Sequence, residues 1–103
     1  MITKKHIIDT LQKEFPKLQS EFKVKRIGLF GSYRQNNAIE ESDIDLLIEF
    51  SEPIGLKFIT LCDYLENLFN KKVDVLTPEG LKSIRVKSIK DNILKTIEYV
   101  DAA

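Results

Sequence analysis

Three short runs of apolar, largely β-branched residues alternate with longer stretches in which apolar residues recur at helical spacing. The runs are Val24 to Phe30, Asp43 to Phe50 and Val73 to Leu76. Each has the length of a strand, and the stretches between and around them have room for helices. The alternation predicts an α/β (α+β) fold, in which a small mixed β-sheet of three or four strands is backed by helices.

The helical stretches carry start signals. Thr3 is placed to cap a helix that reaches about Leu18, since threonine side chains accept hydrogen bonds from the first turn. Thr77-Pro78-Glu79 combines an N-cap, a proline at the first helical position and an acid in the first turn. We expect the helix that follows to run to Val100, and the polar Lys87-Ser88 region leaves a break open.

A third helix is expected from Leu56 to Asn70. Its apolar residues recur every three or four positions, so they form a stripe that faces the core. We expect Cys62 to lie in this stripe as a small core side chain. The expected stripe consists of Leu56, Ile59, Cys62, Leu65, Leu68 and Phe69.

Length and composition limit the class of protein. A chain of 103 residues has room for one core, so we expect a single domain over 1–103. Its 16 basic and 16 acidic residues cancel, whereas general nucleic-acid binders usually carry a basic excess. Cys62 is the one cysteine, which excludes an intrachain disulfide and fits a cytoplasmic protein. No apolar run approaches the roughly 20 residues that span a bilayer, and the N-terminus resembles no secretory signal.

Two carboxylates open the second predicted strand. Asp43 and Asp45 are separated by one residue, so on a strand they leave the same face with Cα atoms roughly 6.5 to 7 Å apart. Such a pair repels unless a cation lies between its members, and oxygen ligands at this spacing suit Mg²⁺ or Mn²⁺. An isolated pair of this kind is also compatible with solvated acids in a turn that enters a strand.

Asp74 is the one charged residue of the third predicted strand. If that strand pairs with the second, three acids on adjacent strands could hold two metal ions about 4 Å apart, as in phosphoryl and nucleotidyl transfer. A satisfied acid at a strand edge is the alternative. A carboxylate among valines is costly without a partner, which favours the metal.

Gly31-Ser32 follows the first predicted strand directly. A glycine here lets the backbone approach a phosphate closely, and the amides that follow can donate to it. Arg34 would add a guanidinium suited to phosphate oxygens. Taken alone, the dipeptide is also compatible with a plain turn, and an ion pair with Glu40 or Glu41 would account for Arg34 equally well.

The two motifs together resemble a known signature. Phe30-Gly31-Ser32-Tyr33-Arg34 followed by Ser42-Asp43-Ile44-Asp45-Leu46 resembles that of the DNA polymerase β-like nucleotidyltransferase superfamily. The short length and the later Val73-Asp74-Val75-Leu76-Thr77-Pro78 resemble its minimal nucleotidyltransferase family, from bacteria and archaea. The resemblance runs from about Ile27 to Thr77.

The resemblance implies a metal-dependent enzyme that transfers a nucleotidyl group, AMP from ATP, to an acceptor hydroxyl. Gly31 and Ser32 would bind the nucleotide phosphates. Arg34 would also contact the phosphates, which is expected from the chemistry of its guanidinium and not from the resemblance. Asp43 and Asp45 would hold two Mg²⁺ ions, for which Mn²⁺ could substitute, and Asp74 would be the third carboxylate.

Members of this family commonly lie beside a small helical protein of the HEPN class and act as antitoxins to that ribonuclease toxin. The resemblance therefore implies a tyrosine of such a partner as the acceptor. The alternative is a non-catalytic, nucleotide-binding antitoxin that neutralises its partner by contact. A small-molecule or RNA acceptor ranks third, because so short a chain hardly builds a pocket for either. The sequence leaves a homo-oligomer open.

Overall fold

The computed structural model describes residues 2–101. Within them the predicted α/β class is confirmed, with helices before and between the strands. The helices are α1 (Lys4–Phe22), α2 (Gly31–Arg34), α3 (Lys57–Phe69), α4 (Pro78–Lys82) and α5 (Lys87–Thr96). The strands are β1 (Val24–Phe30), β2 (Ile44–Phe50), β3 (Val73–Leu76) and β4 (Glu98–Tyr99).

The strands form one mixed sheet in the order β3-β2-β1-β4. Strand β1 is antiparallel to both of its neighbours, β2 and β4, whereas β2 and β3 are parallel. Parallel neighbours need a long crossover, which α3 provides here. Because β2 and β3 run in the same direction, the residues at their starts lie at the same end of the sheet.

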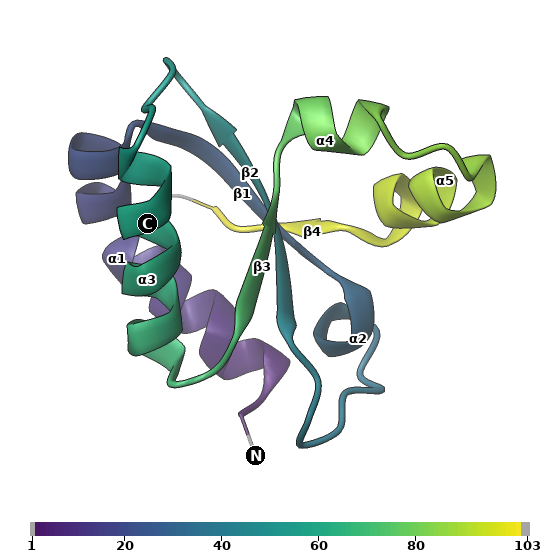
Figure 1. Ribbon diagram of the computed structural model, residues 1–103. Coiled ribbons are helices and arrows are strands. Elements are labelled where there is room, and N and C mark those ends of the chain that lie inside the picture. The colour runs from purple at the N-terminus through teal and green to yellow at the C-terminus, as the bar shows by residue number, and fades with distance from the viewer. Residues whose placement is uncertain (1, 102–103) are drawn as a thin grey trace.

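Helices cover both faces of the sheet (Figure 1), α1 and α3 on one side and α4 and α5 on the other. The main core lies on the α1 and α3 side, where Ile44, Leu46 and Ile48 of β2 are fully buried. A smaller core on the opposite side contains Leu47, Leu81 and Ile93. Alternate residues of β2 are therefore buried on opposite faces, as expected of a central strand.

Two predicted helix starts are confirmed. The side chain of Thr3 accepts a hydrogen bond from the amide of His6 at 3.1 Å, and that of Thr77 accepts one from the amide of Gly80 at 3.1 Å. Helix α1 continues past the predicted end at Leu18, because Phe22 extends its buried stripe by one more turn. None of the helices within residues 2–101 has the length and apolar character needed to cross a membrane.

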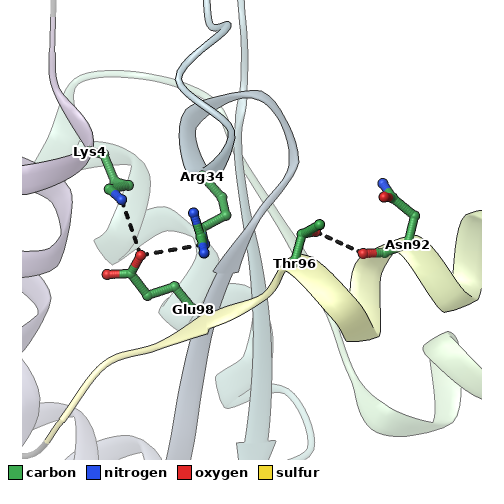
Figure 2. Close-up of polar contacts among 5 residues, drawn as sticks. All are labelled: Lys4, Arg34, Asn92, Thr96 and Glu98. Carbon is green, nitrogen blue, oxygen red and sulfur yellow. Dashed lines mark hydrogen bonds and ion pairs between the residues drawn. The ribbon is translucent and has the colours of Figure 1, made fainter.

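The helix predicted to run to Val100 is broken before Lys87, as the polar Lys87-Ser88 region allowed, but its predicted end is wrong. Helix α4 ends at Lys82, α5 ends at Thr96, and Ile97 turns the chain into the extended strand β4. The Thr96 hydroxyl donates to the carbonyl of Asn92 at 2.7 Å in the last turn of α5 (Figure 2). The amide of Val100 donates to Ile27 of β1 at 2.8 Å, so the C-terminal segment pairs an edge that would otherwise be open.

The predicted buried stripe of α3 is confirmed for Leu65 and Phe69 and is wrong at the start of the helix. Its fully or nearly buried residues are Leu61, Leu65 and Phe69, whereas Leu56 and Ile59 are exposed. Cys62 is half-buried rather than a core residue, and this partial burial raises the pKa of its thiol. Leu56 is the N-cap residue, directly before the helix begins at Lys57.

Candidate functional site

The three predicted acids lie at the starts of two neighbouring strands, at one end of the sheet. Asp43 lies just before β2, Asp45 is its second residue, and the parallel register pairs Asp45 directly with Asp74 of β3. Leu47, two residues after Asp45, is buried in the smaller core. The alternation along β2 therefore directs Asp45 to the side of the sheet that faces α4 and α5. We call Asp43, Asp45 and Asp74 the acid cluster.

Gly31 lies against this cluster. The register pairs Phe30 with Asp45 across β1 and β2, and Gly31 follows with a φ of +77° that favours glycine. A Cβ atom at this position would collide with Oδ2 of Asp45. The turn after β1 and the carboxylate of β2 therefore depend on the absence of a side chain at residue 31.

The environment of Asp45 disfavours its charge. Partial burial of the carboxylate raises its pKa to about 6, and the negative charges of Asp74 and Asp43 act in the same direction. A group that is costly to ionise beside two other acids is stabilised by a nearby cation. Such tuning is common at functional sites.

The donor set fits a hard divalent cation, since carboxylate oxygens are the ligands that Mg²⁺ and Mn²⁺ prefer. Among residues 2–101, however, no three acidic, histidine or cysteine side chains already converge as a ready ligand set. The side chains of Asp43 and Asp74 are 38% and 52% exposed, and exposed side chains can change rotamer at small cost. The backbone places the acids on neighbouring strands, and an ion would draw their oxygens together.

Two consecutive lysines from the turn between α3 and β3 reach this region. The ammonium of Lys71 donates to the carbonyl of Glu40 at 2.6 Å and lies 5.9 Å from the centroid of the Tyr33 ring. It thereby ties down the loop that leads to Asp43. The ammonium of Lys72 lies 3.9 Å from a carboxylate oxygen of Asp43 and 3.9 Å from one of Asp74.

Arg34 is paired with an acid that the sequence did not suggest. Figure 2 shows its guanidinium pointing toward Glu98 of β4, with Nε 3.4 Å from Oε1. Lys4 of α1 reaches the same oxygen at 3.2 Å. The predicted alternative of an ion pair for Arg34 is therefore correct in kind, but Glu40 and Glu41 are not the partners. Tyr33, the residue before Arg34, is buried in the main core.

Comparison with known proteins identifies the family. A family model described as a nucleotidyltransferase domain matches residues 8–100. The chain belongs to this family. The nucleotidyltransferase domain is thus an enzyme fold of the class that its paired motifs predicted, and the resemblance stated above is confirmed.

Relatives and solved structures agree with this assignment. The protein adenylyltransferase MntA of Thermococcus cleftensis is 40% identical over 101 residues, which cover 97% of this chain and 98% of that relative. A solved minimal nucleotidyltransferase superposes with a TM-score of 0.70 at 22% identity, over 94% of this chain and 95% of that chain. A toxin-antitoxin crystal structure with AMP-PNP gives a TM-score of 0.63 at 21% identity, over 99% and 75% of the two chains. The two superpositions confirm the fold.

The sequence analysis did not identify two charged residues near the site of this nucleotidyltransferase domain, Lys72 and Glu98. Lys72 stands two positions before Asp74, so strand alternation alone indicates that both side chains leave the same side of β3. That signal was available. Glu98 gave no such signal, because it lies in a stretch whose isoleucine spacing predicted a helix. Its partners Lys4 and Arg34 are brought close to it only by the fold.

Proposed function

We propose that this nucleotidyltransferase transfers AMP from ATP to a hydroxyl of a protein partner, a tyrosine of a small helical HEPN-type toxin, and thereby acts as its antitoxin. Gly31 and Ser32 would hold the phosphates, with Arg34 as a third contact. Asp43, Asp45 and Asp74 would hold two Mg²⁺ ions, or Mn²⁺ in their place. The metal ions would neutralise charge on the attacking and leaving oxygens.

The observation that carries this proposal is the contact between Gly31 and Asp45, together with the pairing of Asp45 with Asp74. It joins a turn that can approach phosphates to a set of acids that suits divalent cations. The raised pKa of Asp45 supports the same proposal, because a partly buried carboxylate beside two other acids is stabilised when a cation binds.

The proposed reaction is a displacement at the α-phosphorus of ATP. The acceptor oxygen would attack the α-phosphorus of ATP and form a new P–O bond, while the bond between that phosphorus and the oxygen bridging to the β-phosphate breaks. Pyrophosphate leaves with the bridging oxygen. Asp74, which is exposed whereas Asp43 and Asp45 are half-buried, would accept the acceptor's proton.

The open setting of the acid cluster favours a protein acceptor. Small-molecule sites are usually enclosed pockets, whereas the side chains of Asp43 and Asp74 are partly exposed. A cavity of about 460 Å³ does exist, but it is lined by Glu49 to Pro53, Pro78 and Glu79 and includes no residue of the acid cluster. A partner that carries its own tyrosine would complete the site without a pocket.

The names of related proteins support the acceptor class. The Thermococcus cleftensis relative is named a protein adenylyltransferase, and the superposed complex with AMP-PNP is a toxin-antitoxin pair. A cytoplasmic location and the number of copies in the assembly stay predictions of the sequence.

The test is transfer of label from α-labelled ATP, with Mg²⁺, to the product of the neighbouring gene. Wild type should label the partner, and the double variant Asp43→Asn, Asp45→Asn should not. Asp63→Asn is the matched control, because Asp63 is an exposed acid on α3 and its loss should leave labelling intact.

Two results would separate the alternatives. A stable, unlabelled complex with an inhibited toxin would replace the proposed enzyme by a module that acts through contact. Full labelling by the double variant would show that the acid cluster has no part in the chemistry. Thermal melts of each variant should show one cooperative transition, which excludes unfolding as the cause of lost activity.

A further inference from the structure

Lys72 lies between two of the three acids. Its ammonium is 3.9 Å from Oδ2 of Asp43 and 3.9 Å from Oδ1 of Asp74. Within residues 2–101 it is the one basic side chain that forms ion pairs with the acid cluster. A single positive charge thus faces a group of three carboxylates, at the distance of an ion pair from two of them.

The backbone fixes this position. The carbonyl of Lys72 accepts a hydrogen bond from the amide of Ile44 at 3.0 Å, which ties it to the residue between Asp43 and Asp45. The next amide, that of Val73, donates to Oε2 of Glu66 on α3 at 3.2 Å. The backbone of Lys72 is therefore held beside the acids, whereas its side chain is 66% exposed and free to move away.

From this placement we propose that Lys72 is the resident counter-ion of the acid cluster and makes the binding of divalent metal depend on nucleotide. This inference rests on the proposed function, because it concerns the same metal site. Its ammonium occupies two carboxylates that a metal ion needs. A divalent ion must displace that ammonium and bind close to it, and both effects weaken binding of the metal alone.

A bound nucleotide would give the ammonium of Lys72 a second set of anionic partners. The phosphates of ATP carry several negative charges, which pair with an ammonium released from Asp43 and Asp74. The lysine then has a partner outside the cluster, and its three donors on a flexible stem suit such a transfer. Metal and nucleotide would each make binding of the other more favourable, and this coupling is necessarily reciprocal.

The test is a calorimetric titration of the full chain with Mn²⁺ alone, and again with a non-hydrolysable ATP analogue present. Lys72→Met should bind Mn²⁺ alone about threefold to tenfold more tightly than wild type, the size expected from losing two exposed ion pairs. With the analogue present this advantage should disappear. Lys72→Arg keeps the charge and should match wild type in both titrations.

Lys25→Met is the matched control. Lys25 has a side chain 64% exposed and pairs with Glu49 at 3.6 Å, so its loss changes the total charge equally without touching the acid cluster. Tighter Mn²⁺ binding by Lys25→Met to the same degree would reduce the effect to total charge and overturn the inference. Unchanged or weaker Mn²⁺ binding by Lys72→Met would overturn it directly, as would an advantage that the analogue leaves undiminished.

Failure of the proposed function would be recognised separately. Mn²⁺ binding that is lost in Asp43→Asn but indifferent to Lys72→Met would preserve the metal site and reject only the role of Lys72. Absence of Mn²⁺ binding by wild type, both alone and with the analogue, would reject the metal site and the inference together.

Discussion

Oδ2 of Asp45 occupies the space where a Cβ atom of residue 31 would lie. Gly31 follows β1 and begins α2, whereas Asp45 belongs to β2, and the antiparallel register that pairs Phe30 with Asp45 brings the two together. The glycine thus serves two needs, a φ of +77° and room for a neighbouring carboxylate. The phosphate turn and the acid cluster are coupled through this one contact.

Gly31→Ala should damage the site more than the fold. The new methyl group must push Asp45 aside. In addition, alanine must adopt a left-handed backbone conformation at residue 31, at a cost of about 1 to 2 kcal/mol. We expect transfer activity to fall at least tenfold while the protein still unfolds cooperatively, measured by the labelling assay and by thermal melts. Gly55→Ala is the matched control, because Gly55 also has a positive φ of +57° but open space around its Cβ position. Equal loss of activity in both variants would contradict the contact argument.

The stability of the metal-free protein should depend on pH through the ionisation of Asp45. Its pKa is raised to about 6 in the folded state from an ordinary value of 3.8, so between these values the folded state binds more protons than the unfolded state. Stability from this group therefore falls as pH rises through that window. It is lost above about pH 6 and restored below about pH 4.

Asp45→Asn removes this dependence. In the presence of a chelator, the melting temperature of the variant minus that of wild type should increase from pH 4 to pH 6.5 and then level off. Asp63→Asn should show no such trend. A temperature difference that is constant over this range would mean that the folded and unfolded pKa values of Asp45 are the same.

The elements that the sequence predicted correctly have local causes. Thr3 and Thr77 cap helices through side chains acting on amides three residues away, and the alternation around Asp45 follows from the pleat of one strand. The parallel pairing that brings Asp74 beside Asp45 was conditional on β3 joining β2, and the structure meets that condition. Motif residues could be found because their spacing alone carries the geometry.

The failures have non-local causes. Strand β4 forms because β1 has an edge to pair, and this tertiary requirement overrides the helical spacing of Ile93 and Ile97. Glu98 acquires Arg34 and Lys4 from segments 64 and 94 residues away, so no short pattern could reveal it. On α3, packing against α1 and β3 decides which face is buried, so Leu61 is in the core although the spacing favoured Ile59.

The corrected register of α3 can be tested with two identical substitutions. Leu61 is fully buried, whereas Leu56 is 85% exposed. Leu61→Ala should lower the free energy of unfolding by about 2 to 5 kcal/mol through lost burial and a cavity, and Leu56→Ala by less than about 0.5 kcal/mol. Denaturant titration measures both. Equal effects would return Leu56 to the core, as the sequence pattern first suggested.

Glu98 should limit how firmly Arg34 holds a phosphate. One oxygen of Glu98 lies 3.4 Å from Nε of Arg34 and 3.2 Å from Nζ of Lys4. Glu98→Gln removes the charge that competes with phosphate for the guanidinium. We therefore expect ATP to bind about twofold to fivefold more tightly, the range set by one partly exposed ion pair. The melting temperature should fall slightly, because Lys4 and Arg34 then face each other without an acid between them.

Calorimetry with the non-hydrolysable analogue measures this change, and a double variant assigns it. Arg34→Met in the Glu98→Gln background should abolish the gain, because the gain depends on a freed guanidinium. Glu52→Gln, which removes an exposed acid near the other end of β2, is the matched control and should leave affinity unchanged. A gain that survives loss of Arg34 would assign it to Lys4 or to general charge, and Arg34 would then be a structural partner of Glu98 rather than a phosphate ligand.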